Sequence, residues 1–259
     1  MDQFRLQILS DLHLEVERPD EPLYAYDFPV SAPNLALLGD IGWTRDDRLF
    51  DWLRAQLARF ETVFFVCGNH EPYGVDATVK DSMDRLKSFQ QSSSGKLIVL
   101  DRTRFDVSPT LTILGCTLWS ALDPDCLDIL SWSLTDFKRI HGFDAAFYNT
   151  LHQTDLAWLC ESVEIIRRDE PHRRVVVLTH HAPTIEGTGD PKYIGGPTSS
   201  AFATELIEFP CWGSPVHMWA FGHTHWCCDF ERKGVRVYAN QRGYGTGTTD
   251  FDPSKAVLL

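Results

Sequence analysis

Five short clusters of residues that commonly bind metal ions are spread along the 259-residue chain. They contain six of the ten histidines, together with two aspartates and one asparagine. The clusters are Asp11 and His13, then Asp40, then Asn69 and His70, then His180 and His181, and finally His223 and His225. Carboxylate, carboxamide and imidazole groups form a ligand set of intermediate softness, which suits Mn, Fe, Zn, Co or Ni. The residue types therefore predict a transition-metal site.

The spacing inside two of these clusters fits a shared site. Asp11 and His13 lie two positions apart, so an extended backbone would direct both side chains the same way and Leu12 the other way. His223 and His225 repeat this spacing near the other end of the chain. Both pairs are therefore candidate metal ligands.

Glycines precede two of the candidate ligands. Gly39 comes directly before Asp40, and Gly68 comes directly before Asn69. A glycine at such a position lets the backbone turn tightly and approach bound ions closely. Asp40 has two carboxylate oxygens, which makes it the natural bridge between two ions.

Each cluster follows a short apolar run of the kind that forms a buried strand. The runs have four to six residues, are rich in Val, Leu, Ile and Phe, and are bounded by glycine or polar residues. The predicted strands are Phe4–Leu9, Leu35–Leu38, Val63–Val66, Val175–Leu178 and Val216–Phe221. Open α/β sheets assemble ligand sites at the carboxyl ends of their strands. The five clusters are thus expected to meet at one edge.

Apolar residues at helical spacing predict helices between these strands. The predicted helices are Asp46–Phe60, Ala77–Phe89 and Leu156–Arg167. Alternating strands and helices in the first 100 residues favour a βαβ beginning. Asp229 to Tyr238 is typical of a hairpin that turns at Lys233 and Gly234. Residues 120–155 fit neither pattern and are interpreted as a lid or excursion near the site.

Composition limits the classes of partner. The chain has 36 acidic and 24 basic residues, a formal net charge of −12, and no block of five basic residues. Such a charge repels polyanions, so we expect no nucleic-acid polymer as a partner. The N-terminal residues do not predict a signal peptide, and no apolar run reaches the roughly 20 residues that span a bilayer. We expect a cytoplasmic protein with no membrane association.

The order of the motifs resembles a known signature. The segments Asp11-Leu12-His13, Gly39-Asp40, Gly68-Asn69-His70-Glu71, Thr179-His180-His181 and Gly222-His223-Thr224-His225 resemble the calcineurin-like metallophosphoesterases. Gly115–Trp119, Thr135–Ile140 and Asn240–Tyr244 extend the resemblance to small single-domain members, found mostly in microbes. The resemblance covers nearly the whole chain. It implies one domain over residues 1–259, folded as a four-layer α/β/β/α sandwich of two mixed β-sheets flanked by helices.

The same resemblance implies a role for each motif residue. One ion would be held by Asp11, His13, Asp40 and His225, and a second by Asp40, Asn69, His180 and His223. His180 is preferred to His181 because the first histidine after this strand normally fills the role in the family. His70 would be an acid outside the ligand set. The cofactors implied are two transition-metal ions, Mn first and Fe, Zn, Ni or Co as alternatives.

The activity implied is hydrolysis of a phosphoester. A hydroxide shared by the two ions would attack phosphorus in line with the leaving oxygen, and His70 would protonate that oxygen or stabilise its charge. The resemblance favours a phosphodiesterase for a small soluble substrate, with cyclic nucleotides as one class. A phosphomonoesterase or protein phosphatase is the alternative activity. A non-catalytic scaffold of the same fold is the alternative of another class, opposed by the presence of His70 and every ligand.

Five further residues are candidate substrate contacts. Trp43 and Trp119 follow a motif or a strand and are candidates to flank a ring, with core packing as the alternative. Arg242 and Tyr244 lie in a glycine-rich loop and are candidates to orient phosphate or the ligand loops. His181 is a candidate for a substrate contact, for support of a ligand, or for stabilising its own loop.

Asp136 and Lys138 belong to one of the segments that resemble the family, but the sequence assigns them no role. Opposite charges two residues apart in a polar stretch often form an exposed ion pair, which contributes little stability. We therefore interpret them as part of a salt-bridged surface.

Overall fold

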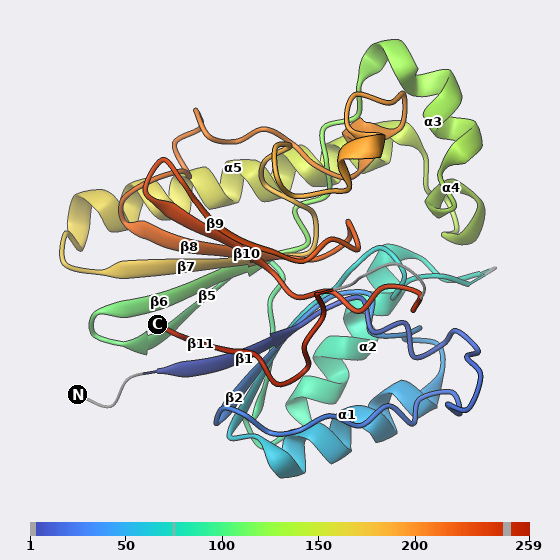
Figure 1. Ribbon diagram of the computed structural model, residues 1–259, viewed down its shortest axis with the longest axis horizontal. Helices are drawn as coiled ribbons and strands as arrows, with labels where there is room; N and C mark the ends of the chain where they lie inside the picture. Colours follow the sequence, from blue (N-terminus) through green and yellow to red (C-terminus); the bar gives the residue numbers. More distant parts are fainter. Residues whose placement is uncertain (1–3, 75, 246–249) are drawn as a thin grey trace.

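The protein consists of two β-sheets that pack face to face, with helices on the outer face of each (Figure 1). This computed structural model describes residues 4–74, 76–245 and 250–259. The first sheet has the order β11-β1-β2-β3-β4. Its strands are β1 (Arg5–Leu9), β2 (Asn34–Leu38), β3 (Thr62–Val66), β4 (Leu97–Val99) and β11 (Ala256–Leu258). Strands β1 to β4 are parallel, and β11 is antiparallel at the edge.

The second sheet has the order β5-β6-β7-β8-β10-β9. Its strands are β5 (Thr103–Ser108), β6 (Leu111–Cys116), β7 (Arg174–Thr179), β8 (Val216–Phe221), β9 (Cys228–Arg232) and β10 (Val235–Ala239). The four central strands are parallel, and β5 and β9 are antiparallel edges. The pairing of β9 with β10 confirms the predicted hairpin.

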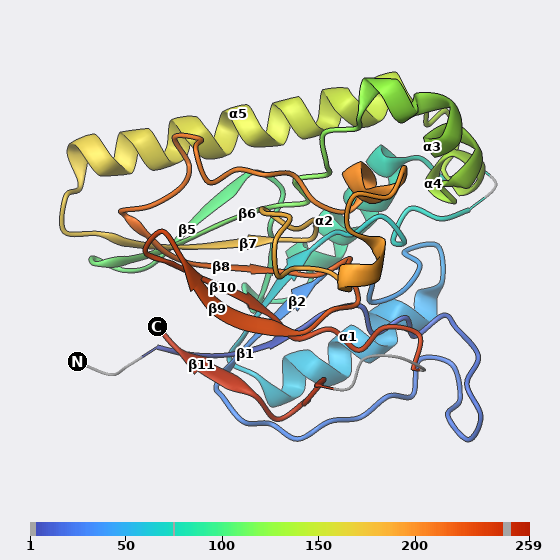
Figure 2. The same ribbon diagram turned by 45° about the horizontal axis from the view of Figure 1, so that its top comes forward.

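Helices complete the four layers, which confirms the predicted α/β/β/α sandwich. The helices α1 (Asp47–Arg59) and α2 (Val79–Gln91) cover the first sheet, and α5 (Ala145–Asp169) runs along the second (Figure 2). Side chains alternate along each strand: Leu37 packs towards α1 and α2, whereas Ala36 and Leu38 pack between the sheets. Apolar side chains on both faces of the strands make the sheet positions rigid.

The predicted helix Leu156–Arg167 is too short. Helix α5 begins eleven residues earlier, where the Asp144 side chain accepts a hydrogen bond from the Phe147 amide. Its first part buries Tyr148, His152 and Asp155, so the buried face carries polar groups and the apolar period is hidden there. Within the described ranges no helix, α5 included, has the length and apolar character needed to cross a membrane.

The segment expected to be a lid or excursion, residues 120–155, is largely helical. It contains a 3₁₀ turn (Pro124–Cys126), α3 (Leu127–Ser133), α4 (Asp136–Arg139) and the start of α5. A second excursion leaves β7 and carries two 3₁₀ turns, Pro191–Tyr193 and Ser199–Ala201, before β8. Both excursions lie at the same end of the molecule (Figures 1 and 2). The sequence did not predict the second one.

Candidate metal centre

The parallel strands bring the five motif clusters together. Strands β1, β2 and β3 of one sheet and β7 and β8 of the other direct their carboxyl ends to the same side of the molecule. We call the seven predicted ligands at these ends the ligand edge: Asp11, His13, Asp40, Asn69, His180, His223 and His225. Most of these residues are completely or almost completely buried. The predicted convergence is what the structure shows.

Five residues of the ligand edge have an unusual backbone conformation. The φ angles are 53° at Asp11, 46° at His13, 54° at Asp40, 71° at His223 and 52° at His225. Non-glycine residues rarely adopt positive φ, and such residues cost on the order of 1–3 kcal/mol each. The surrounding fold therefore holds these turns, and strain of this kind concentrates at functional sites.

Gly68 allows two ligand loops to pass very close to each other. A Cβ atom at this position would lie 2.6 Å from the Asp40 amide nitrogen and 2.9 Å from Cε1 of His180. Neither neighbour can withdraw, because one is backbone and the other a buried ring. The glycine that the sequence placed before Asn69 is thus required by the approach of the Asp40 loop.

One group of donor atoms lies at the ends of β1 and β8. The Nε2 atoms of His13 and His225 are 3.0 Å apart, and the His225 Nε2 lies 3.4 Å from Oδ1 of Asp11. Donor atoms of these three residues all lie within 4.8 Å of one another. Two imidazole nitrogens and a carboxylate oxygen that converge in this way suit a transition-metal ion.

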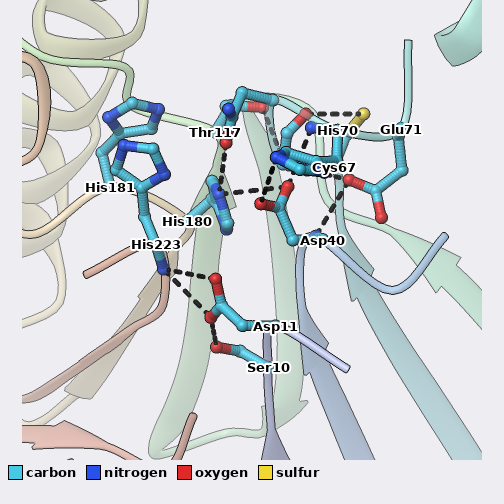
Figure 3. Close-up of polar contacts among 12 residues, drawn as sticks. Ser10, Asp11, Asp40, Cys67, His70, Glu71, Thr117, His180, His181 and His223 are labelled. Atoms are coloured by element: carbon cyan, nitrogen blue, oxygen red, sulfur yellow. Dashed lines mark hydrogen bonds and ion pairs between the residues drawn. The ribbon is translucent and has the colours of Figure 1, made fainter. Parts of the chain in front are cut away.

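A second group lies at the ends of β2, β3 and β7. His180 directs Nε2 to within 3.0 Å of Oδ1 of Asn69 and 3.3 Å of Oδ1 of Asp40. The other oxygen of Asp40, Oδ2, lies 3.9 Å from Nε2 of His13 in the first group. Asp40 therefore stands between the two groups, as expected of a bridging carboxylate. Figure 3 shows its contact with His180.

His181 occupies a different position from His180. Its Nδ1 lies 2.9 Å from the Ser120 hydroxyl, and its ring packs against that of His223 at a centroid distance of 4.0 Å (Figure 3). The His181 ring is buried and its Nε2 has no hydrogen-bond partner, whereas His223 is partly exposed. His180, His181 and His223 can also bring donor atoms within 4.8 Å of one another. His181 is thus placed to support His223, and it does not line the cavity described below.

Glu15 joins two histidines of the site. Its Oε1 lies 3.2 Å from Nδ1 of His13 and 3.1 Å from Nδ1 of His70. Although burial lowers the pKa of His70, the charges of Asp40 and Glu15 raise it to about 9. Glu15 was not among the predicted site residues. The alternation expected from an extended backbone does not hold here, because Asp11 and His13 turn at positive φ, so only the nearness of Glu15 to His13 in the sequence could have indicated it.

Glu71 connects the Asp40 loop with the Asn69 loop. Its buried carboxylate accepts hydrogen bonds from the backbone amides of Asp40 (3.0 Å), Ile41 (2.7 Å) and Gly68 (2.6 Å). Buried backbone amides need such acceptors, because an unpaired one is costly. Glu71 therefore fixes both loops without belonging to the ligand edge.

Asp136 is buried, so its interpretation as a surface ion pair is wrong. One carboxylate oxygen, Oδ1, accepts hydrogen bonds from Nδ2 of Asn69 (2.8 Å) and from the Tyr73 hydroxyl (2.6 Å). The hydrogen bond from Asn69 to Asp136 holds the amide nitrogen of Asn69 away from the site, so that the amide oxygen of Asn69 faces His180. The segment after β3 is joined to α4 by a hydrogen bond from the Gly74 amide to the Arg139 carbonyl at 2.8 Å, a contact that sequence spacing cannot reveal. Lys138, two residues later, bonds instead to the carbonyl of Trp132.

Comparison with known proteins decides the family. Residues 4–227 match the family described as "Calcineurin-like phosphoesterase". The chain belongs to this family. It is 28% identical over 267 residues to "Uncharacterized protein L509" of Acanthamoeba polyphaga mimivirus. The aligned region covers 96% of this chain and 94% of that protein.

Two solved structures share the fold of this phosphoesterase. A phosphopantetheinyl hydrolase from Mycobacterium tuberculosis has a TM-score of 0.69 and 18% identity, over 93% of this chain and 90% of that one. A putative 5'-nucleotidase from Staphylococcus aureus has a TM-score of 0.50 and 16% identity, over 93% of this chain and 49% of that one. The family and the shared fold indicate a phosphoester hydrolase, and the His/Asp clusters provide places for metal.

A cavity of about 490 Å³ opens onto the ligand edge of the phosphoesterase. Its floor includes Asp40, Asn69, His70, His223 and His225. Its walls come from the two excursions: Ser133, Leu134, Thr135 and Asp136 on one side, and Ile185, Thr188, Gly189, Asp190, Tyr193, Ile194, Thr198, Ser199, Phe202 and Ala203 on the other. Among the residues that the structure describes, no lysine or arginine lines this cavity.

Tyr244 is the one predicted substrate contact that lines this cavity among the described residues. Its hydroxyl lies 3.3 Å from Nε2 of His70, and its ring stacks on His13 at a centroid distance of 4.4 Å. The side chain is nevertheless half exposed. Tyr244 can therefore contact a substrate or shield the site.

The other predicted contacts have different roles. Trp119 is buried against Phe143 and Tyr148, so core packing, the alternative interpretation, is correct. The Arg242 guanidinium bonds to both carboxylate oxygens of Glu21, at 2.8 and 2.6 Å, and does not line the cavity. Trp43 lies under the guanidinium groups of Arg45 and Arg139, also outside the lining. Position after a motif was not sufficient to identify a substrate contact.

Proposed function

We propose that this phosphoesterase hydrolyses a singly charged phosphodiester of a small soluble substrate. The observation that carries the proposal is the absence of lysine and arginine from the described lining of the cavity over the ligand edge. A phosphomonoester carries about one charge more than a diester, and proteins usually bind that charge with arginine. The lining instead contributes the carboxylates of Asp136 and Asp190, the second of which is paired with Lys192 at 2.5 Å.

The donor set of the ligand edge fits two transition-metal ions, with Mn first and Fe, Zn, Ni or Co as alternatives. We assign Asp11, His13, Asp40 and His225 to one ion, and Asp40, Asn69, His180 and His223 to the other. Bound ions would lower the pKa of a water and offset charge on the phosphoryl oxygens. The net charge of −12 argues against a nucleic-acid polymer as substrate.

His70 is the candidate proton donor to the leaving oxygen. The Glu15 carboxylate accepts a hydrogen bond from Nδ1 of His70. The other ring nitrogen, Nε2, therefore points towards the cavity and lies 3.8 Å from Oδ2 of Asp40. This orientation places an N–H group beside the bridging carboxylate, next to where a phosphoryl group would lie. A positioned acid of this kind typically contributes 10²–10⁴-fold.

The test compares a diester with a monoester under controlled metal loading. The protein is stripped with a chelator, reloaded separately with Mn, Zn, Ni, Co, Fe or Mg, and assayed with bis-p-nitrophenyl phosphate and p-nitrophenyl phosphate. Cyclic nucleotides and a phosphopantetheinyl ester, the latter suggested by the name of the solved relative, complete the panel. We expect metal-dependent turnover with the diester faster.

Two other outcomes would change the conclusion. Faster turnover of the monoester would identify a phosphomonoesterase and overturn the diester proposal. Absence of turnover with every metal and substrate, in protein that binds two ions, would favour the non-catalytic scaffold.

A further inference from the structure

We infer that the wall of the cavity formed by Ile185, Tyr193, Ile194 and Phe202 is a binding subsite for an uncharged aromatic or alkyl arm of the substrate. This inference rests on the proposed diesterase function and deepens it. We call these four residues the apolar wall. All four come from the excursion between β7 and β8, which lies beside the ends of the strands (Figures 1 and 2).

The exposure of the apolar wall is unusual for such large side chains. The exposed fractions are 41% for Ile185, 69% for Tyr193, 45% for Ile194 and 39% for Phe202. Scattered exposed apolar residues are ordinary, but these gather in one concave surface. Grouped apolar exposure of this kind marks a binding site.

The apolar wall is continuous with the ligand edge. The ring of Phe202 stacks on His223 with a centroid distance of 4.9 Å and an interplanar angle of 23°. Leu134 and Tyr73 line the same cavity from the opposite side. A group attached to a phosphorus atom at the ligand edge would therefore reach the apolar wall directly. This continuity favours a part of the substrate over a protein partner.

The Phe202 end of the apolar wall is also held in place by hydrogen bonds to the first excursion. Ser200 accepts a bond from the Asp123 amide at 3.0 Å, and Thr204 accepts one from the Ala121 amide at 2.9 Å. Ala182 and Ala203 form a β-bridge at its base. A surface held in this way loses little conformational freedom when a ligand binds.

Charge defines what the arm can be. The carboxylates of Asp136 and Asp190 line the cavity, and Asp190 pairs with Nζ of Lys192 at 2.5 Å. None of the described lining residues is itself a lysine or arginine, so a second phosphate on the arm would lack the arginine that usually binds phosphate, whereas a phenyl ring, an alkyl chain or a nucleobase needs none. The ligand class is therefore a monoanionic diester with an uncharged, largely apolar arm.

A series of diesters with one constant leaving group tests the subsite. Methyl, butyl and phenyl p-nitrophenyl phosphates are assayed with the metal-loaded protein, and kcat/KM is measured for each. We expect the phenyl ester to exceed the methyl ester by at least about tenfold after correction for their uncatalysed rates, because one methylene in an apolar pocket already gives about 10–200-fold.

Two variants test whether the apolar wall causes the preference for the phenyl ester. Ile194→Ser and Tyr193→Ser change exposed positions and should reduce the phenyl-to-methyl ratio several-fold. Ile165→Ser is the matched control, since Ile165 has a similar exposed fraction of 38% but lies on α5 outside the cavity lining. The control should keep the wild-type ratio.

Three results would overturn the subsite. The first is a wild-type ratio near one, and the second is a high ratio that both wall variants retain. The third is a dimer in sedimentation that Ile194→Ser dissociates, which would make the wall an interface between copies. Failure of the proposed function is distinct, because it would appear as faster turnover of the monoester or as no turnover of any ester, and not as a change of the ratio within the series.

Discussion

The ligand edge and the apolar wall adjoin in one cavity but are built in different ways. The ligand edge follows from parallel strands, whose carboxyl ends place buried side chains in fixed turns. The apolar wall belongs to a segment with 3₁₀ turns and exposed side chains. A rigid scaffold with variable loops commonly separates chemistry from specificity in this way. We expect changes in the edge to affect turnover broadly and changes in the wall to affect substrate choice.

The largest effect is expected for Asp40→Asn, at the centre of the ligand edge. The substitution removes the charge between the two donor groups while keeping the shape of the side chain. Metal ions supply several kcal/mol of transition-state stabilisation, so we expect activity to fall by at least about 10³-fold and bound metal to decrease. Metal content by mass spectrometry and kcat/KM measure both effects.

Asp155→Asn is the matched control for Asp40→Asn. Asp155 is also a buried aspartate, but it pairs with Arg102 and with the Leu118 amide, away from the ligand edge. The control should lose stability and keep its metal. Full metal occupancy with normal turnover in Asp40→Asn would contradict the bridging assignment.

His70→Gln should have the next largest effect and should separate catalysis from metal binding. His70 lies beside the bridging carboxylate, outside the proposed ligand set. We expect kcat to fall by about 10²–10⁴-fold while both ions remain bound, because the variant lacks a proton donor. His217→Gln, at an exposed position of β8, is the control and should behave as wild type. Loss of metal in His70→Gln would make His70 a ligand instead.

Sequence patterns were most informative about the ligand edge. The strand of Val216–Phe221 was predicted with its observed limits, because apolar runs in parallel strands are buried on both faces. The extended backbone expected at Asp11 and His13 is wrong, because both residues lie beyond the end of β1 at positive φ, and the resemblance was the better guide to them. Strands β4, β5, β6 and β11 were not predicted. β5 is an edge strand with partly buried and exposed side chains, and β4 and β11 have three residues each, but the buried run of β6 could have been recognised.

The walls of the cavity were much harder to predict. Asp136 contacts Asn69 across 67 positions in the sequence, and Ser200 meets Asp123 across 77. Such contacts depend on how two excursions fold over the strand ends, which no local period encodes. Exposed wall residues such as Ile194 also follow neither strand nor helix spacing, so their pattern does not predict a site.

Asp136 belongs to the first excursion but contacts the ligand edge. Its substitution therefore tests whether a residue of the cavity wall affects metal binding or substrate choice. Asp136→Ala removes the acceptor that holds Nδ2 of Asn69. Loss of a group that orients a ligand typically costs 10–100-fold in metal affinity or activity, and we expect a loss in that range. Titration of the stripped protein with Mn measures it.

Asp136→Asn keeps an acceptor oxygen and should restore part of the lost affinity. Asp128→Asn, at an exposed position on α3, should change nothing. If Asp136→Ala binds metal normally but changes the preference among diesters, Asp136 belongs functionally to the wall.

Tyr244→Phe should have the smallest effect, because Tyr244 is half exposed and is not one of the predicted metal ligands. The variant keeps the ring that stacks on His13 and removes the hydroxyl that lies 3.3 Å from Nε2 of His70. A hydrogen bond contributes a net 0.5–1.5 kcal/mol, so we expect kcat/KM to fall by about two- to tenfold with metal content unchanged. Tyr244→Ala, which also removes the ring, should fall further. A loss of more than about a hundredfold in Tyr244→Phe would instead make the hydroxyl part of the chemistry at the ligand edge.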